Sequence, residues 1–151
     1  YKPILLGDDI EGESRELAIE HAILAHTYQR RRERVAILSG GETTVSIKNS
    51  IGRGGPNTEY ALSLALALDG APGIWAIACD TDGIDGSEHN AGALVTPKGI
   101  LNAKETGIPA IKMLEENNSF CFFEALGELV ITGPTRTNVN DFRVILVDQI
   151  N

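Results

Sequence analysis

A continuous apolar segment that runs directly into a cluster of acids and glycines constrains the fold of this chain more than any other feature. Residues 73–79 read Gly-Ile-Trp-Ala-Ile-Ala-Cys, and Asp80, Asp82 and Asp85 follow them at once. A short apolar run bounded by turn residues is typical of a strand buried within a sheet. In open α/β sheets the ligand binds beyond the ends of such strands. The junction therefore predicts an α/β sheet with a ligand site at the end of this strand.

Strand and helix patterns alternate along the rest of the chain. Ser14 is a suitable N-cap for an amphipathic helix that ends at three consecutive arginines, and residues 58–68 read as a second helix. Strand patterns at 35–38 and 43–47 are separated only by a glycine turn, so we expect a mixed sheet. The predicted class is α/β, a single three-layer-like domain with a mixed sheet flanked by helices. Further strands are expected at residues 2–7, 74–79, 129–131 and 142–147, a strand or a turn at 91–95, and further helices at 97–106, 109–116 and 120–126.

Composition narrows the class of protein. With 151 residues the chain is long enough for one domain with a buried core and too short for two. Its formal net charge of -8 argues against a nucleic-acid partner, which needs a basic surface. No apolar run is long enough to span a bilayer and no signal pattern opens the chain, so we expect no membrane partner and a cytoplasmic location. Cys79 and Cys121 match no metal-ligand spacing and are expected to be reduced.

A glycine-rich loop, residues 52–57, precedes the second predicted helix. The consecutive glycines Gly54 and Gly55 allow backbone N–H groups to converge on an anion, and the following helix adds the positive end of its dipole. Arg53 could add a bidentate contact to the same anion. The alternative is a tight loop in which the glycines serve only steric needs. A dinucleotide fingerprint would need a third glycine, and a P-loop would need Lys-Ser/Thr after the glycines, so neither is present.

The acidic loop that begins at Asp80 is a second candidate site. Asp80, Asp82 and Asp85 could bind Mg2+ together with substrate phosphates, because hard cations take carboxylate oxygens. The spacing does not match an EF-hand. The alternative is a set of Asx turns, in which the carboxylates accept hydrogen bonds from nearby backbone N–H groups. His89 in the same loop is either an acid or base for a substrate or an ordinary surface histidine.

Two other polar loops lie at expected strand ends. Residues 39–43 contain Glu42, and residues 132–141 contain Asn138 among several side chains that form hydrogen bonds. Neither loop contains a pair of nucleophile and base. A ligand-binding rim and a structural turn network are equally consistent with their composition.

Five motifs in a fixed order give the chain a family resemblance. They are Ser-Gly-Gly-Glu-Thr-Thr-Val at 39–45, Gly-x-Gly-Gly-x-Asn-x-Glu-x-Ala-Leu at 52–62, Asp-Thr-Asp-Gly-Ile-Asp-Gly at 80–86, Ala-Gly-Ala at 91–93 and Thr-Gly-Pro-Thr-x-Thr-Asn-Val-Asn-Asp at 132–141. Together the motifs extend over nearly the whole chain. The chain resembles the C-terminal MOFRL domain of the class II glycerate kinases, a family in which some members are named hydroxypyruvate reductases.

The resemblance implies an enzyme that uses ATP and Mg2+ to phosphorylate D-glycerate, usually at the 2-hydroxyl. The reaction would take place in a cleft between this domain, residues 1–151, and an N-terminal Rossmann-like domain that carries a catalytic lysine. The chain enters a strand pattern almost at its first residue, as a piece of a longer polypeptide would. The isolated piece is therefore expected to be inactive.

The resemblance and the residue chemistry together suggest roles for individual side chains. Residues expected in catalysis are Arg53, Asp80 and Asp82; expected metal ligands are Asp80, Asp82 and Asp85; expected substrate or phosphate ligands are Gly54, Gly55, Asn57, Glu42 and Asn138.

One position departs from the family pattern. Many members have an arginine directly after the double glycine, where this chain has Pro56, while Arg53 stands before the glycines. Whether Arg53 takes the role of that arginine is left open by the resemblance.

Two other functions are compatible with the sequence. A hydroxypyruvate reductase that uses NAD(P)H would need its dinucleotide site outside this chain, because none is recognisable here. A non-catalytic module that binds a small anion or mediates dimerisation, with the chain as a homodimer, would show a large exposed apolar face beside an uncharged loop region.

Overall fold

The computed structural model describes residues 1–48 and 51–149, and its strands form one six-stranded sheet with the order β1-β2-β6-β3-β4-β5. β1 and β2 pair in parallel and the other described pairs are antiparallel, so the predicted mixed sheet is confirmed. The strands are β1 Lys2–Glu13, β2 Val35–Thr44, β3 Ile74–Asp80, β4 Gly92–Val95, β5 Leu129–Val130 and β6 Asp141–Val147. The helices are α1 Ser14–Arg30, α2 Pro56–Leu68, α3 Gly99–Glu105, α4 Ala110–Glu115 and α5 Ser119–Leu126.

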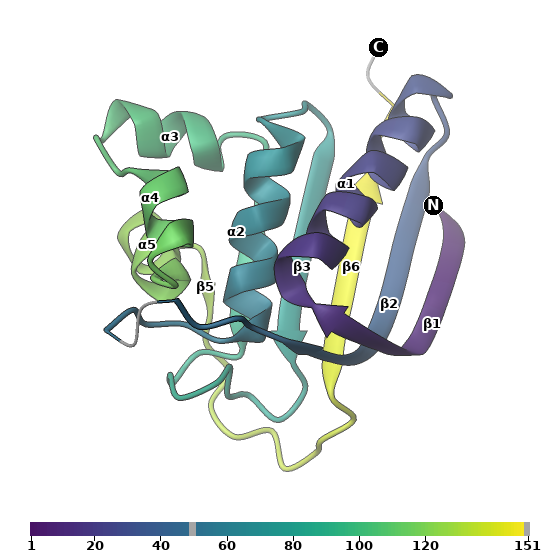
Figure 1. Cartoon of the computed structure of the whole chain (residues 1–151). Helices are drawn as coiled ribbons and strands as arrows, with labels where there is room; N and C mark the ends of the chain where they lie inside the picture. Colours follow the sequence, from purple (N-terminus) through teal and green to yellow (C-terminus); the bar gives the residue numbers. More distant parts are fainter. Residues whose placement is uncertain (49–50, 150–151) are drawn as a thin grey trace.

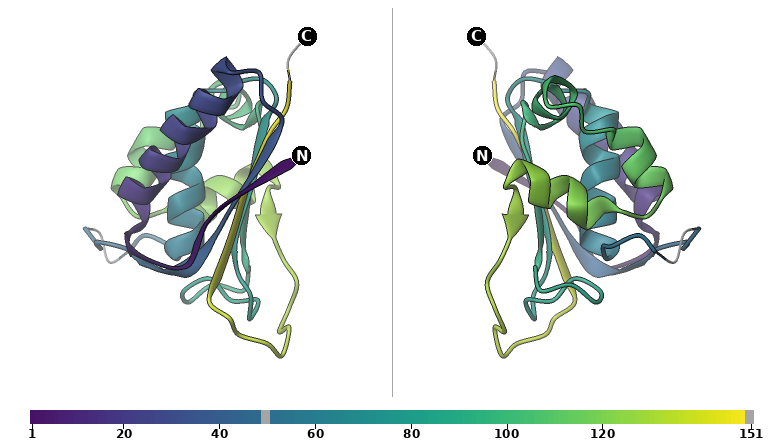
Figure 2. Two further views of the ribbon diagram at one scale, coloured as in Figure 1. Left: turned by 90° about the vertical axis from the view of Figure 1, so that its right-hand side faces the viewer. Right: turned by 90° about the vertical axis from the view of Figure 1, so that its left-hand side faces the viewer.

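The helices lie on one side of the sheet (Figure 1, Figure 2). α1 packs on β1, β2 and β6, and α2 packs on β3 and β4. α3, α4 and α5 surround α2 towards the β5 end of the sheet. The α/β class is confirmed, and the described residues form two layers, the sheet and the helices on one of its faces, where three were expected. The opposite face of the sheet carries no helix from the described part of the chain.

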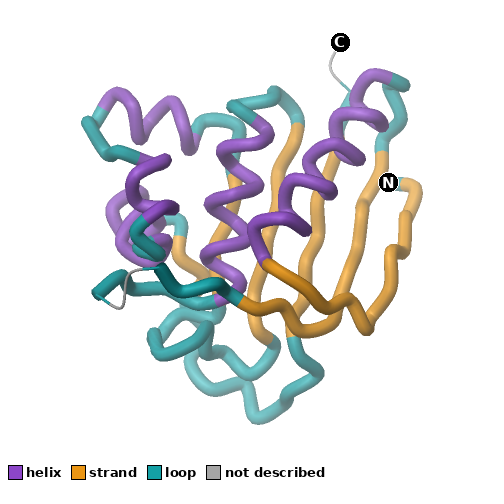
Figure 3. Tube along the Cα trace, in the orientation of Figure 1, coloured by secondary structure: helices purple, strands orange, loops and turns teal. Residues whose placement is uncertain are grey.

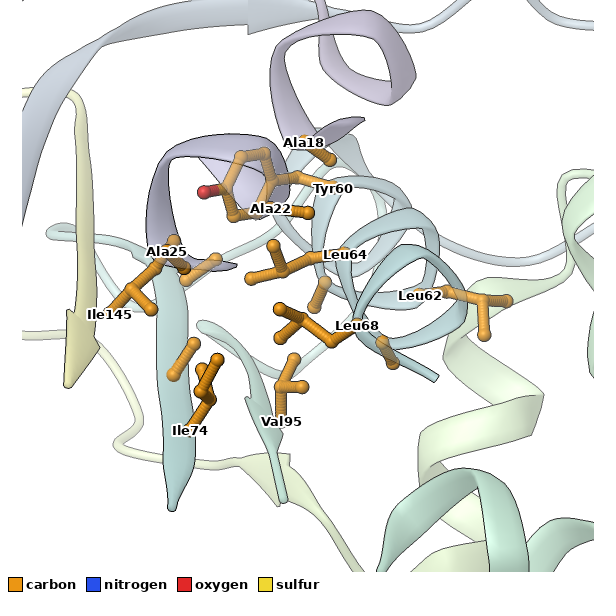
Figure 4. Packing of buried hydrophobic residues seen from close by; sticks show 14 of the residues in the cluster. Ala18, Ala22, Ala25, Tyr60, Leu62, Leu64, Leu68, Ile74, Val95 and Ile145 are labelled. Carbon is orange, nitrogen blue, oxygen red and sulfur yellow. The ribbon is translucent and has the colours of Figure 1, made fainter. Parts of the chain in front are cut away.

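The hydrophobic core lies between the sheet and the two long helices (Figure 4). Ala18, Ala22 and Ala25 recur at helical spacing on α1 and are buried, and their small side chains allow α1 to pack closely against α2. α2 is buried on nearly all sides because α1 covers it on one side and α4 and α5 on another. This position explains why its sequence is almost continuously apolar.

The structure corrects the predicted glycine turn at residues 39–42. β2 continues without a break to Thr44 and pairs with β1 on one side and β6 on the other, so no separate strand forms at 43–47. Gly41 has a φ of 108°, and a Cβ at this position would collide with the backbone of Ile10. The glycine therefore permits the close approach of β1 at an irregularity in the parallel register, and it does not reverse the chain.

The bounds of the other elements differ from the sequence patterns by a few residues in either direction, and those of β1 differ most. β1 runs on through polar residues to Glu13, because it remains paired with β2 over that length. Within residues 91–95, where the sequence is compatible with a strand or a turn, Gly92–Val95 form strand β4. None of the described helices combines the length and the apolar character that crossing a bilayer requires.

Candidate functional site

Three polar segments meet at one edge of the sheet, which lies at the bottom of Figure 3. β3 and β6 run antiparallel with Asp80 opposite Asp141, and β2 places Gly41 opposite the same Asp141. The ends of β2 and β3 and the start of β6 therefore coincide. The acidic loop, residues 80–90, and the loop at residues 131–140 leave the sheet side by side at this edge.

Hydrogen bonds join the acidic loop to the 131–140 loop. The Thr81 hydroxyl donates to the carbonyl of Asn140 at 2.8 Å and accepts the N–H of Val139 at 2.8 Å. The N–H of Thr135 donates to the carbonyl of Asp82 at 3.1 Å. The two loops thus form one structural unit. Thr81, which the sequence analysis did not single out, is its central residue.

Asp80 and Asp82 form consecutive Asx turns on this unit. Asp80 Oδ1 accepts the N–H of Asp82 at 2.9 Å, and Asp82 Oδ1 accepts the N–H of Ile84 at 2.8 Å. Asp82 Oδ2 accepts the side-chain amide of Asn138 at 3.3 Å. Burial is the main cause that raises the pKa of Asp80, and the negative charges of Asp82 and Asp141 add to it. The alternative of Asx turns is therefore right for one oxygen of each of these two carboxylates. The negative charge concentrated at this place still favours the binding of a cation.

The three-carboxylate metal site expected from the sequence does not form. Within residues 1–48 and 51–149, no three Asp, Glu, His or Cys side chains are placed to share a metal ion. The pair Asp80 and Asp82 nevertheless fits Mg2+, which takes one or two carboxylates and completes its shell with substrate phosphates and water. The predicted role of Asp85 as a third ligand does not fit its position.

Asp85 instead caps the N-terminus of α2. Its carboxylate accepts the N–H of Asn57 at 2.9 Å, the N–H of Thr58 at 2.8 Å and the Thr58 hydroxyl at 2.8 Å. The anion-binding site predicted at the start of α2 is thus occupied by the protein's own carboxylate. Burial raises the pKa of Asp85 to about 6, and the hydrogen bonds from Asn57 and Thr58 oppose this shift.

The double glycine serves this packing. The N–H of Gly55 already donates to the Thr58 hydroxyl at 3.0 Å, and a Cβ on Gly55 would lie 2.5 Å from Cγ of Asp85. A Cβ on Gly54 would collide with the Ser119 hydroxyl. The steric interpretation of the loop therefore agrees with the structure. A phosphate bound by the first N–H groups of α2, those of Asn57 and Thr58, would have to displace Asp85.

We expect Gly55→Ala to lower the free energy of unfolding by about 2 kcal/mol, because the added methyl group would push Asp85 away from the N-terminus of α2. Equilibrium denaturation in urea measures this change. Gly99→Ala is the matched control, since the nearest atom to a Cβ at this first residue of α3 is the end of the flexible Glu128 side chain, at 3.1 Å. Equal midpoints for the two variants would contradict the packing described for Asp85.

Arg53 does not point freely towards a ligand. Its guanidinium pairs with Glu88 of the acidic loop at 2.7 Å and lies over the ring of Phe120, 4.3 Å from the ring centroid. The ring of His89 meets the same phenylalanine edge-on at 5.5 Å. Arg53 and His89 therefore belong to a cluster formed with α5, and an anionic ligand would have to compete with Glu88 for the guanidinium.

A buried polar network, which the sequence analysis missed, links the acidic loop to the sheet. Asp141 Oδ1 accepts the amide of Asn57 at 2.7 Å, and Asp141 Oδ2 accepts the N–H of Thr43 and pairs with Arg143, both at 3.1 Å. The amide of Asn57 also lies 3.4 Å from Asp85. Asn57 connects these groups and is only 2% exposed. It is therefore not placed to contact a substrate, although the sequence predicted a substrate or phosphate ligand at this position.

Glu42 and Asn138 remain at the exposed edge. Glu42 follows Gly41 near the end of β2 and is exposed, and Asn138 is exposed beside Asp82.

On the helix-free face, the same edge borders a hollow of about 620 Å³. The lining residues are Leu5, Gly7, Asp8, Leu38, Ser39, Gly40, Thr81, Val139, Asp141 and Phe142. The edge therefore combines carboxylates, an amide and space for a small polar molecule.

His21 lies behind the buried network. Its Nδ1 is 2.7 Å from the hydroxyl of Tyr60, whose ring faces the guanidinium of Arg143 at 5.5 Å. Burial, followed by the positive charge of Arg143, lowers the pKa of His21 from 6.5 to about 4. The imidazole is therefore neutral in the folded protein at neutral pH.

The lowered pKa of His21 predicts a loss of stability in acid. The unfolded chain binds a proton at this histidine near pH 6.5 and the folded chain near pH 4, so stability present above 6.5 is lost as the pH falls towards 4. Between pH 7 and pH 5, wild type is expected to lose about 2 kcal/mol more than His21→Gln in urea denaturation. The raised pKa of Asp85 changes the stability in the opposite direction as the pH falls. This contribution is present in both proteins, so it cancels in the comparison of wild type with His21→Gln. Parallel pH profiles would show that His21 is not buried as described.

The chain is similar to known proteins over most of its length. Residues 35–141 match the model described as the MOFRL family. An Agrobacterium vitis protein named "Putative hydroxypyruvate reductase" is 52% identical over 150 residues, which cover 96% of this chain and 34% of that protein. The glycerate 2-kinase of Pyrococcus horikoshii is 34% identical over 154 residues, which cover 97% of this chain and 34% of that protein. The crystal structure of the glycerate kinase from Thermotoga maritima matches with a TM-score of 0.93 and 33% identity, over 97% of this chain and 36% of that chain. The chain thus spans about a third of the length of these relatives.

Proposed function

The chain belongs to the MOFRL family, and from this we propose that it is the C-terminal domain, residues 1–151, of a glycerate kinase that transfers phosphate from ATP to D-glycerate. The observation that supports this most directly is the joining of the acidic loop to the 131–140 loop beside an open hollow. Relatives with the same fold include proteins named glycerate kinase. The proposed acceptor is the 2-hydroxyl, as the name of the Pyrococcus relative states for that protein.

The chemistry of phosphoryl transfer suits this edge of the sheet. The reaction requires mainly that the reacting groups are positioned and that phosphate charge is neutralised. Asp80 and Asp82 are proposed to hold Mg2+, which would neutralise that charge when bound. Asn138 orients Asp82, and Glu42 lies at the same edge, where a glycerate hydroxyl could donate to it. Arg53 is proposed as an anion contact only if a phosphate draws it away from Glu88.

The rest of the active site is proposed to lie outside this chain. The relatives are about three times as long, which leaves room for an N-terminal domain that supplies the other wall of the cleft. The isolated chain is accordingly proposed to lack kinase activity, and the full-length enzyme to be cytoplasmic.

A coupled assay of ADP release by the full-length protein tests the proposal. We expect turnover that requires D-glycerate, ATP and Mg2+ together. Absence of turnover in a folded protein, under conditions where a glycerate kinase such as the Pyrococcus relative is active, would overturn the kinase proposal.

A hydroxypyruvate reductase is the second candidate, because the Agrobacterium relative at 52% identity carries that name. Oxidation of NAD(P)H by the full-length protein with hydroxypyruvate, without ADP release from ATP and D-glycerate, would favour it. A non-catalytic module would combine a large exposed apolar face with an uncharged loop region. The carboxylates of Asp80 and Asp82 at the sheet edge argue against the second of these features.

A further inference from the structure

The centre of the helix-free face is apolar. Side chains alternate along β3 and β6, and those directed away from the helices belong to apolar residues. Trp75 and Phe142 on this face are 49% and 44% exposed, and Leu94 of the neighbouring β4 is 42% exposed. The central positions are Ala36 and Leu38 on β2, Trp75, Ile77 and Cys79 on β3, Phe142, Val144 and Leu146 on β6, and Leu94 on β4. We call this set the open face.

A shallow hollow lies at the middle of the open face. It measures about 230 Å³, and its walls include Trp75, Ile77, Leu94, Val144 and Leu146. Its lining contains no charged side chain. A contiguous apolar surface with such a hollow is characteristic of a surface that another protein segment covers.

Helices are the kind of cover that this sheet already has on its other face. β1 and β2 pair in parallel and are joined through α1, the kind of unit from which sheets with helices on both faces are built, although the other described pairs are antiparallel. The five described helices all occupy one face (Figure 2). A second helical layer would complete the usual three-layer α/β architecture.

We propose that the open face is covered, in the full-length protein, by a helical layer from the polypeptide outside residues 1–151. This inference rests on the proposed function for the existence of that polypeptide. The relatives supply enough chain, because the matched third leaves about two thirds of their length. β3 and β6 have seven residues each, and strands of that length extend about 23 Å, which a helix of about 15 residues would match.

A second copy of this chain is a poorer occupant. Each copy carries a formal charge of -8, so two copies placed face to face would repel each other.

The helical layer also explains how the cleft would be built. The larger hollow of about 620 Å³ shares Leu38 and Phe142 with the open face, so a layer on that face would end beside the acidic loop.

Hydroxyl-radical footprinting of the full-length protein, read by peptide mass spectrometry, tests this proposal. Trp75 is the single tryptophan of the chain and reports directly on the open face. We expect Trp75 and Leu94 to be labelled at least about tenfold more slowly in the native than in the urea-unfolded protein, because the core of a packed interface excludes solvent. Leu101 and Ile111, which are 53% and 65% exposed on the helical side, should show little protection and serve as internal controls.

Labelling of Trp75 and Leu94 as fast as that of the two controls would overturn the proposal. Protection that disappears on dilution, together with a halving of the mass in sedimentation, would also overturn it, in favour of a second copy. Leu94→Asp provides an independent test: it should increase Trp75 labelling, whereas the control Leu101→Asp should not, and equal labelling in the two variants would contradict the proposal. None of these readouts depends on turnover, so an inactive protein with a protected Trp75 would refute only the kinase proposal.

Discussion

Asp82→Asn in the full-length protein is expected to lower the ATP-dependent turnover of D-glycerate by about two to three orders of magnitude. The structure holds the Asp82 carboxylate in place with the N–H of Ile84 at 2.8 Å and the amide of Asn138 at 3.3 Å. Asparagine preserves the size of the side chain and one acceptor oxygen, so the Asx turn can persist. It removes the negative charge that the proposed Mg2+ requires. Coupled ADP release measures the effect.

Asp69→Asn is the matched control for this variant. Asp69 follows the C-terminal end of α2, away from the N-terminal end that Asp85 caps, and its exposed carboxylate lies 3.7 Å from Lys104. Its φ of 44° is one that asparagine also tolerates. We expect this control to keep its turnover, and thermal unfolding to show that both variants are folded. Equal turnover in the two variants would remove the acidic loop from the chemistry.

Arg143→Met is expected to lower the free energy of unfolding by about 3 to 5 kcal/mol, the usual cost of removing one partner of a buried ion pair. Arg143 is 1% exposed and pairs with Asp141 at 3.1 Å beneath the ring of Tyr60. Without the guanidinium, the Asp141 carboxylate would stay buried with only the hydrogen bonds from Asn57 and Thr43. Urea denaturation at neutral pH measures the loss.

A double-mutant cycle separates the ion pair from the packing of the arginine. Arg143→Met combined with Asp141→Asn should cost less than the sum of the two single changes, because the second change removes the unpaired charge. Arg34→Met is the control, since Arg34 pairs with Asp148 at the surface at 2.9 Å and should contribute less than about 1 kcal/mol. Additive costs in the cycle would show that Arg143 acts through its volume alone.

The edge of the sheet that carries the candidate site could be predicted from sequence because the signals there are local. An apolar run that stops at Asp80 predicts both a strand and its end, and β3 does end at Asp80. The polar residues before Asp141 likewise predict a loop before β6. The sequence did not indicate that Thr81 joins the two loops, because the residues that it contacts lie 58 and 59 positions away.

The roles of Asp85 and Arg143 could not be assigned from local pattern. A carboxylate in a glycine-rich loop has the same local sequence whether it binds a metal or caps a helix, and the position of α2 decides in favour of the cap. Arg143 could have been noticed, because it shares a face of β6 with Ile145 and Val147 at a spacing of two residues. A charged residue in that position requires a partner, and the partner Asp141 precedes it by two residues on the same face.

The sequence by itself determined the α/β class, the mixed sheet, the family and the loops that border the candidate site, since these follow from periodicity within short segments and from motif order. Only the tertiary structure decided which carboxylates remain available at the sheet edge and which are used internally, and that the described helices leave one apolar face open. The physical reason is distance along the chain. Asp85 meets the N-terminus of α2 across 28 positions, and Asp141 meets Asn57 across 84, so their roles depend on packing that no short segment encodes.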